Sequence, residues 1–217
     1  MQCATIGGVA RRSIRGDALM ASVKHGGGAY HGPEYSVYQL AAGAVVTESL
    51  LRGVVSIHQG RVQPGAVPGE GALEELARRV SEEPKALKLG EWLRRTGPWA
   101  REAIERELEE AGLARGWTRR ILFVYREPCL EILDQGAQDE VFHAVRETFL
   151  RAGMIDREEA LLILLLREVA VLQHLFRTTR GRGHRRRFGE LWASLPEDVQ
   201  VALKEYERWQ PRGAADG

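Results

Sequence analysis

The stretch SVYQLAAGAVVTESLLR, residues 36–52, decides the fold. Its apolar positions, among them Val37, Leu40 and Ala44, recur at helical spacing, and few charges interrupt them. A helix of this kind is largely buried, so we expect other elements to pack around it. Gly53 follows directly and predicts the end of the helix, because glycine favours the left-handed conformation that closes many helices.

Further helix and hairpin signals follow along the chain. We predict helices at residues 71–82, 86–96, 98–111, 137–152, 157–176 and 187–208, a small hairpin at 54–63, and strands at 121–125 and 129–132. Pro98 suits the first turn of a separate helix. The predicted fold class is mainly α, a single-domain helical bundle with small β-hairpins. Its domain spans residues 14–209, between flexible tails at 1–13 and 210–217.

Composition sets the broad class. The 217 residues are 44% hydrophobic and 28% charged, which is typical of a globular protein with one good core or two small ones. Two cysteines make no disulfide framework, so a cytoplasmic location is predicted. The longest apolar run, residues 160–166, is far shorter than the roughly 20 residues that span a bilayer. We therefore expect a protein that is not integral to a membrane.

Catalytic and metal-binding patterns do not appear in the sequence. The six histidines show no spacing typical of a metal site, and Cys129 has no histidine partner motif, which predicts a small buried side chain. Acidic residues fall on helix faces beside arginines, as in Arg101 and Glu105, where they form surface pairs rather than a catalytic dyad. The sequence therefore predicts no enzyme, no cofactor and no metal.

Basic residues next to an apolar hairpin tip are the main candidate site. Leu122, Phe123 and Val124 are large apolar residues that either insert into a membrane interface or pack against flanking helices. The candidate lipid-binding residues around them are Trp99, Arg101, Arg119 and Arg120. Tryptophan beside arginine can line a headgroup site, although a surface-packed indole fits the same pattern.

A second cationic segment, residues 177–187, holds six arginines and one histidine. Guanidinium groups match phosphate geometry, so its partner is either anionic lipid or nucleic acid. A solvated loop between helices is the alternative. The order helix, glycine, hairpin occurs twice, with the helices ending at Gly53 and Gly112. The same order of elements is found in winged-helix units.

Taken in order, several segments resemble the Golgi phosphoprotein 3 family of phosphatidylinositol-4-phosphate-binding adaptors. The matching segments are Glu48-Ser-Leu-Leu-Arg-Gly53, Pro68-Gly-Glu70, Leu73-Glu-Glu-Leu76, Glu91-Trp92-Leu93, Glu110-Ala-Gly-Leu113 and the apolar hairpin Ile121–Tyr125. The resemblance implies a mainly helical fold and a phosphoinositide pocket of one tryptophan and three arginines. Of that pocket only Arg101 matches, since the other arginine positions fall at Ala42 and Pro98, and the tryptophan position falls near residues 33–35.

The function that we predict is a non-catalytic, peripherally membrane-associated protein. Its partners would be anionic phospholipid or phosphoinositide headgroups at a membrane surface, with a protein partner as a further possibility. Nucleic acid is disfavoured, because the helix before Gly112 is strongly acidic and would repel phosphate. A winged-helix-like nucleic-acid-binding regulator and a protein-interaction scaffold without the lipid pocket are the alternatives.

Overall fold

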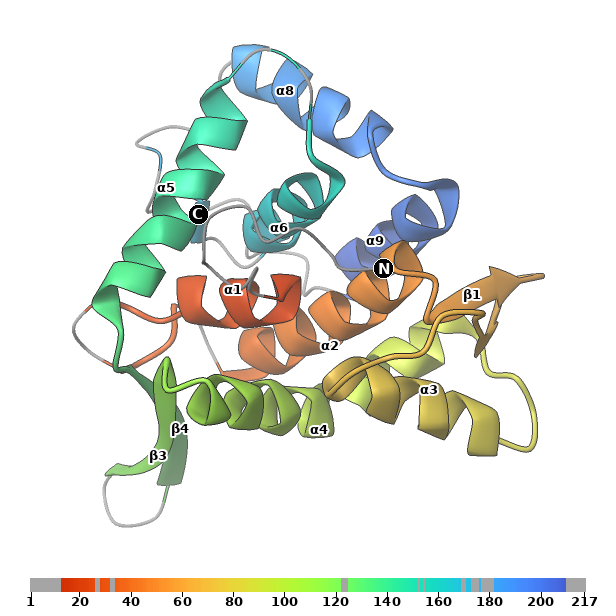
Figure 1. Ribbon diagram of the computed structural model, residues 1–217, viewed down its shortest axis with the longest axis horizontal. Helices are drawn as coiled ribbons and strands as arrows, with labels where there is room; N and C mark the ends of the chain where they lie inside the picture. Colours follow the sequence, from red (N-terminus) through yellow and green to blue (C-terminus); the bar gives the residue numbers. More distant parts are fainter. Residues whose placement is uncertain are drawn as a thin grey trace, which may run out of the picture.

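The computed structural model describes residues 13–25, 28–31, 34–121, 125–151, 153, 155–168, 171–172, 176 and 182–209. Within them the chain forms eight helices and two antiparallel two-stranded sheets, which confirms the predicted mainly α fold (Figure 1). The helices are α1 (Ile14–Ala21), α2 (Glu34–Leu51), α3 (Ala72–Glu82), α4 (Leu89–Glu110), α5 (Gln135–Leu150), α6 (Arg157–Glu168), α8 (Arg182–Ala193) and α9 (Glu197–Trp209). The strands are β1 (Val55–His58), β2 (Arg61–Pro64), β3 (Ala114–Ile121) and β4 (Tyr125–Ile132).

Helix α2 runs through the middle of the molecule, as its apolar sequence predicts. Val37, Leu40 and Val45 are almost fully buried, and α1, α4, α6 and α9 pack around the helix (Figure 1). At Gly43 the ring of Tyr206 from α9 occupies the space of a side chain, because its carbons lie 2.9 Å from the position of a Cβ. Glycine at this position therefore lets α9 approach α2 closely.

Helix α4 is continuous from Leu89 to Glu110, so the predicted division at Pro98 is wrong. Pro98 lies on the exposed side of the helix, where the hydrogen bond that proline removes faces water. The buried positions continue in phase across it, since Leu93 and Ala100 both belong to the core. Packing along α2 therefore holds the residues on both sides of the proline in one helix.

The two helix-to-hairpin junctions have the same geometry. Gly53 and Gly112 have φ angles of 72° and 71°, a conformation that glycine adopts without strain. At each junction the N–H of the next residue donates to the carbonyl five residues earlier, at 2.8 and 2.9 Å. This is the Schellman pattern of helix ends, so the repeat seen in the sequence is a repeated way of closing a helix.

The second hairpin is longer than predicted. Residues 114–120, which are largely polar, form most of β3 and pair with residues 126–132 in the register Ala114 with Ile132 and Ile121 with Tyr125. The division predicted at 126–128 is wrong, because these residues lie within β4 and pair with residues 118–120 of β3. Residues 122–124 lie outside the described residues. Figure 1 shows this hairpin projecting from the helical body.

The helical C-terminal region also differs from the prediction. The single helix expected at 187–208 is two helices, α8 and α9, because Pro196 disfavours helical backbone at the residue before it. Residues 182–186, predicted as loop, form the first turns of α8, while residues 177–181 lie outside the described part of the chain. Helix α8 is at the opposite end of the molecule from the second hairpin (Figure 1).

Candidate functional site

A groove of about 320 Å³ lies between α4 and the second hairpin. Residues on α4 that are three or four apart are neighbours on one helix face, and this face forms one wall. Three consecutive residues of β3 and one residue of β4 form the other. We call this the α4–β3 groove; its lining residues are Arg101, Glu102, Glu105, Arg106, Glu109, Gly116, Trp117, Thr118 and Pro128.

Arg101 is the most deeply placed cation of the α4–β3 groove. The residue is only 9% exposed, and its guanidinium lies over the ring of Tyr38 from α2 at 5.1 Å from the centroid. Its Nη1 is 3.5 Å from Oε1 of Glu105, which is long for a charge-assisted hydrogen bond. Nε and Nη1 are buried and have no hydrogen-bond partner within the described part of the chain. Arg101 thus has donor capacity left over.

Glu105 lies between Arg101 and Tyr30, and both approach the same carboxylate oxygen. The Tyr30 hydroxyl donates to Oε1 of Glu105 at 2.8 Å. Burial, and then the charge of Glu105, raises the pKa of Tyr30 well above its ordinary value, so the hydroxyl remains a neutral donor. Burial also raises the pKa of the Glu105 carboxyl; Arg101 and Tyr30 lower it, whereas Glu102 and Glu109 raise it further.

The hairpin wall adds an indole and a backbone anchor. Trp117 is 44% exposed, which is a large exposed fraction for a tryptophan. Glu109 accepts a hydrogen bond from the backbone N–H of Gly116 at 2.6 Å, so the carboxylate ties β3 to α4. Cys129, opposite Trp117 in the register, is buried as predicted. The exposed indole and the three glutamates therefore share one groove with Arg101.

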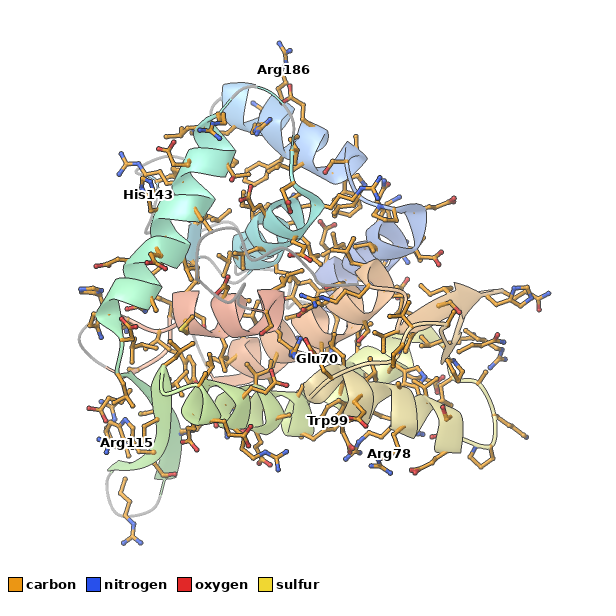
Figure 2. The ribbon with its side chains drawn as sticks, in the orientation of Figure 1. Glu70, Arg78, Trp99, Arg115, His143 and Arg186 are labelled. Atoms are coloured by element: carbon orange, nitrogen blue, oxygen red, sulfur yellow. The ribbon has the colours of Figure 1, made fainter. Side chains whose placement is uncertain are left out.

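The other predicted site residues lie outside the α4–β3 groove. Trp99 is on the side of α4 that faces α3, half-buried, with the guanidinium of Arg79 4.8 Å above its ring (Figure 2). Arg119 and Arg120 are exposed on β3, beyond Thr118 toward the hairpin tip. The predicted insertion residues Leu122, Phe123 and Val124 fall outside the described residues. The structure thus places Arg101 apart from Trp99, and Arg119 and Arg120 further along the hairpin.

Tyr30, Tyr38 and Glu105 complete the surroundings of Arg101, and sequence reasoning did not predict their roles. Arg101 and Glu105 are four residues apart in the sequence, a spacing that predicts only an ordinary surface ion pair on a helix. Tyr30 is 75 positions from its partner Glu105, so no local pattern connects the two. Such contacts appear only when the helices are placed in space.

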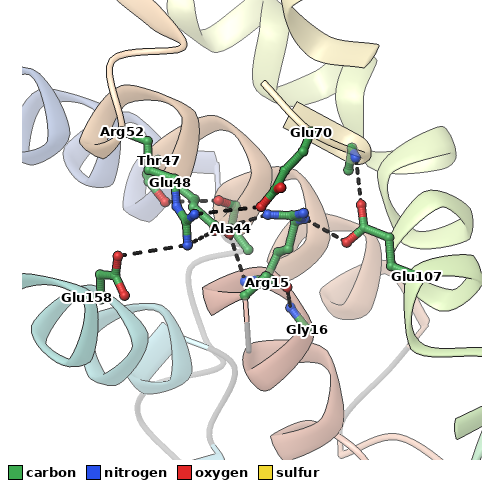
Figure 3. A network of polar contacts seen from close by, with 11 residues as sticks. Arg15, Gly16, Ala44, Thr47, Glu48, Arg52, Glu70, Glu107 and Glu158 are labelled. Carbon is green, nitrogen blue, oxygen red and sulfur yellow. Dashed lines mark hydrogen bonds and ion pairs between the residues drawn. The ribbon is translucent and has the colours of Figure 1, made fainter. Parts of the chain in front are cut away.

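A second cluster of charged side chains joins α1, α2 and the other side of α4 (Figure 3). Glu48 of α2 is fully buried and accepts hydrogen bonds from both the backbone N–H and Nη1 of Arg15, each at 3.0 Å. Nη2 of Arg52 is 2.9 Å from the same carboxylate. Arg15 also donates from Nε to Glu107 of α4 at 2.8 Å. We call these four residues the Glu48 cluster.

The Glu48 cluster joins four helices. The other oxygen of Glu107 accepts the N–H of Ala72 at the start of α3, at 2.6 Å. Burial raises the pKa of the Glu48 carboxyl, and the positive charges of Arg15 and Arg52 partly offset this increase. The segment Glu48–Gly53 therefore matters for the fold, because it supplies both a buried carboxylate and one of its cations.

The described residues contain no group of three or more His, Cys, Asp or Glu side chains that could hold a metal ion. Nor does any of the described helices combine the length and apolar character needed to cross a bilayer.

Fold and site together define a mainly α, single-domain protein with a projecting hairpin beside a charged groove. The family model of Golgi phosphoprotein 3 (GPP34) matches residues 19–206, which is most of the chain. The chain therefore belongs to the Golgi phosphoprotein 3 family, and the resemblance found in its sequence is confirmed. None of the curated proteins compared with the chain matches it.

Proposed function

We propose that the chain is a non-catalytic, adaptor-like peripheral membrane protein that binds anionic phospholipid headgroups with the second hairpin. The observation that carries the proposal is the position of Arg119 and Arg120. Both are exposed on β3, at the far end of a hairpin that projects from the helical body (Figure 1). A projecting cationic end can reach a flat surface without interference from the helices.

The physical basis is the combination of two weak signals. An arginine close to an anionic bilayer contributes about 1 kcal/mol, and inserted apolar side chains add to it. Leu122, Phe123 and Val124 follow the exposed arginines in the sequence after one residue, Ile121, and their insertion remains a prediction. Arg101 in the neighbouring α4–β3 groove is the proposed contact for an individual headgroup phosphate. Trp99 belongs to this proposal only as a packing residue of α4, because Arg79 already covers its ring.

The electrostatics of α4 favour a lipid surface over nucleic acid. Glu102, Glu105 and Glu109 line the groove beside the hairpin, so a long polyanion along this face would meet repeated like charges. A membrane contacts the hairpin end alone. The rival function has Arg185 and Arg186 in its favour, since both are exposed on α8. Mobility shift with duplex DNA, measured against salt concentration, separates these two functions.

Vesicle flotation tests the proposal. The wild-type chain is expected to float with phosphatidylglycerol-containing vesicles at low salt, and less as salt rises. The double variant Arg119→Ala, Arg120→Ala and the single variant Phe123→Asp should both lose most of this binding. The matched control is Arg94→Ala, Arg146→Ala, which removes the same charge from exposed positions on α4 and α5. Equal losses in the hairpin and control variants, or no wild-type binding at low salt, would contradict the proposal.

A further inference from the structure

The charges of the α4–β3 groove do not suit a purely anionic ligand. Three glutamates and two arginines line it, so its formal charge is negative by one. A phosphate placed on Arg101 would stand beside Glu105 and close to Glu102, and each would oppose it. A ligand that matches the whole lining has to bring a positive charge together with its phosphate.

The phosphate half of such a ligand follows from Arg101. The guanidinium is nine-tenths buried, it lines the groove, and its Nε and Nη1 lack hydrogen-bond partners among the described residues. Buried donors without partners are costly, and phosphate oxygens satisfy guanidinium donors in a fork geometry. Arg106 is exposed and also lines the groove, four residues after Glu102, and it provides a second cation for the same group.

The positively charged half of the ligand is inferred from the acidic and aromatic residues that line the rest of the groove. Glu102 is exposed, and Glu105 keeps one carboxylate oxygen that no described hydrogen bond uses, since Tyr30 donates to Oε1. The half-exposed indole of Trp117 lies in the same groove, and a cation over an indole is favourable by electrostatics. Glu102 and Glu109 both raise the pKa of Glu105, so their negative charges add to the charge at this carboxylate. An ammonium group would compensate it.

We propose that the α4–β3 groove binds a phosphate ester carrying a primary ammonium, the chemistry of an aminophospholipid headgroup, with the phosphate on Arg101 and the ammonium between Glu102, Glu105 and Trp117. The groove volume of about 320 Å³ is at the small end of ligand sites, which span roughly 300 to 1,000 Å³, and suits a headgroup of this size. The inference rests on the proposed function only in taking the ligand from a membrane, since the groove does not include the hairpin tip.

A titration with soluble compounds tests the groove separately from the membrane. The probe is glycerophosphoethanolamine, followed by the indole N–H signal of Trp117 in a proton–nitrogen NMR spectrum. Glycerol 3-phosphate and ethanolamine each supply one half of the ligand. Saturable shifts are expected with glycerophosphoethanolamine and at least about tenfold weaker binding with either half. Equal affinity for glycerol 3-phosphate, or no saturable shift, would overturn the inference.

Variants locate the two halves of the site. Arg101→Met and Glu105→Gln should each weaken glycerophosphoethanolamine binding by about tenfold or more, while Glu74→Gln, an exposed glutamate on α3, should leave it unchanged. Glu102→Gln provides a second test at an exposed position, where loss of folding is not a concern. Unchanged binding in both Glu102→Gln and Glu105→Gln would overturn the ammonium subsite.

A vesicle comparison identifies the source of the ligand. At a fixed fraction of phosphatidylglycerol, vesicles with phosphatidylethanolamine should bind more tightly than vesicles with phosphatidylcholine, and Glu105→Gln should remove only this difference. The double variant Arg119→Ala, Arg120→Ala should lose vesicle binding but still bind glycerophosphoethanolamine. Vesicle binding without any lipid preference overturns the inference and leaves the proposed function intact. Soluble binding without vesicle binding overturns the proposed function and makes the ligand a free phosphate ester.

Discussion

The Glu48 cluster and the α4–β3 groove both contain a buried arginine beside a glutamate, yet they are arranged differently. In the cluster, Arg15 makes hydrogen bonds of 2.8 to 3.0 Å to two carboxylates, and Glu48 is fully enclosed. In the groove, Arg101 is 3.5 Å from Glu105 and has unpartnered donors among the described residues. Buried charges that satisfy one another hold helices together, whereas a buried charge left partly unpaired at a groove is available to a ligand.

The largest expected effect comes from breaking the ion pair between Arg15 and Glu48 in the Glu48 cluster. Glu48→Gln keeps the shape of the side chain but leaves Arg15 and Arg52 without their shared carboxylate. Removing one partner of a buried ion pair costs about 3–5 kcal/mol, so the free energy of unfolding should fall by that amount in urea denaturation followed by circular dichroism. The matched variant is Glu105→Gln, in which the Tyr30 hydroxyl keeps an acceptor. If both variants lose the same stability, the distinction between cluster and groove is wrong.

A smaller effect is expected when the cation of the groove is replaced. Arg101→Met fills a similar volume with apolar atoms, and it removes a guanidinium that is poorly paired. Because the contact between Arg101 and Glu105 is long, at 3.5 Å, the free energy of unfolding should fall by less than the roughly 3–5 kcal/mol expected when a closely paired buried charge loses its partner. Thermal unfolding measures it, with Arg15→Met as the comparison that should be strongly destabilised. A large loss for Arg101→Met would mean that Arg101 is a structural residue.

The groove should also have its own pH dependence. Because burial raises the folded-state pKa of Glu105, the folded protein binds this proton more tightly than the unfolded chain. The contribution of Glu105 to the free energy of unfolding therefore decreases as pH rises from the ordinary carboxyl pKa through the raised value. Comparing wild type with Glu105→Gln in urea unfolding from acid to neutral pH should reveal this slope in the wild type only. Parallel curves would show that Glu105 is not perturbed.

The smallest effect is expected at a solvent-facing pair. A hydrogen bond from Arg78 on α3 lowers the pKa of Glu75 to about 2, although the pair is largely exposed. A lowered pKa adds stability above the ordinary carboxyl pKa, and that stability is lost as pH falls toward 2. Since exposed ion pairs contribute little, Glu75→Gln should cost a small fraction of what Glu48→Gln costs. Comparable losses would mean that burial does not set the strength of these pairs.

Local patterns in the sequence predicted the helices better than their boundaries. The period of α2 and the positive-φ glycines after α2 and α4 are local signals, and both agree with the structure. Pro98 is a local signal too, but tertiary packing along α2 overrides it. β3 escaped prediction because its polar residues show no alternating apolar pattern.

The candidate site was predictable only in part, for the same reason. Arg101 emerged from a family motif, and the exposed Arg119 and Arg120 from their position in the hairpin sequence. Tyr30 and its partner Glu105 are 75 positions apart in the sequence, and Arg15 and its partner Glu107 are 92 positions apart. Contacts at such separation leave no periodic trace in the sequence, so neither the loose pairing of Arg101 nor the Glu48 cluster could be inferred before the helices were placed.

The most direct test is a comparison of two arginine signals in one spectrum. The side-chain Nε–H resonances of Arg101 and Arg15 would be followed as bicelles of phosphatidylglycerol and phosphatidylethanolamine are added to the wild-type chain. We expect the Arg101 signal and the Trp117 indole signal to shift, while the Arg15 signal stays in place. Shifts confined to α8, or no shift at Arg101, would contradict a membrane-facing role for the hairpin and its groove.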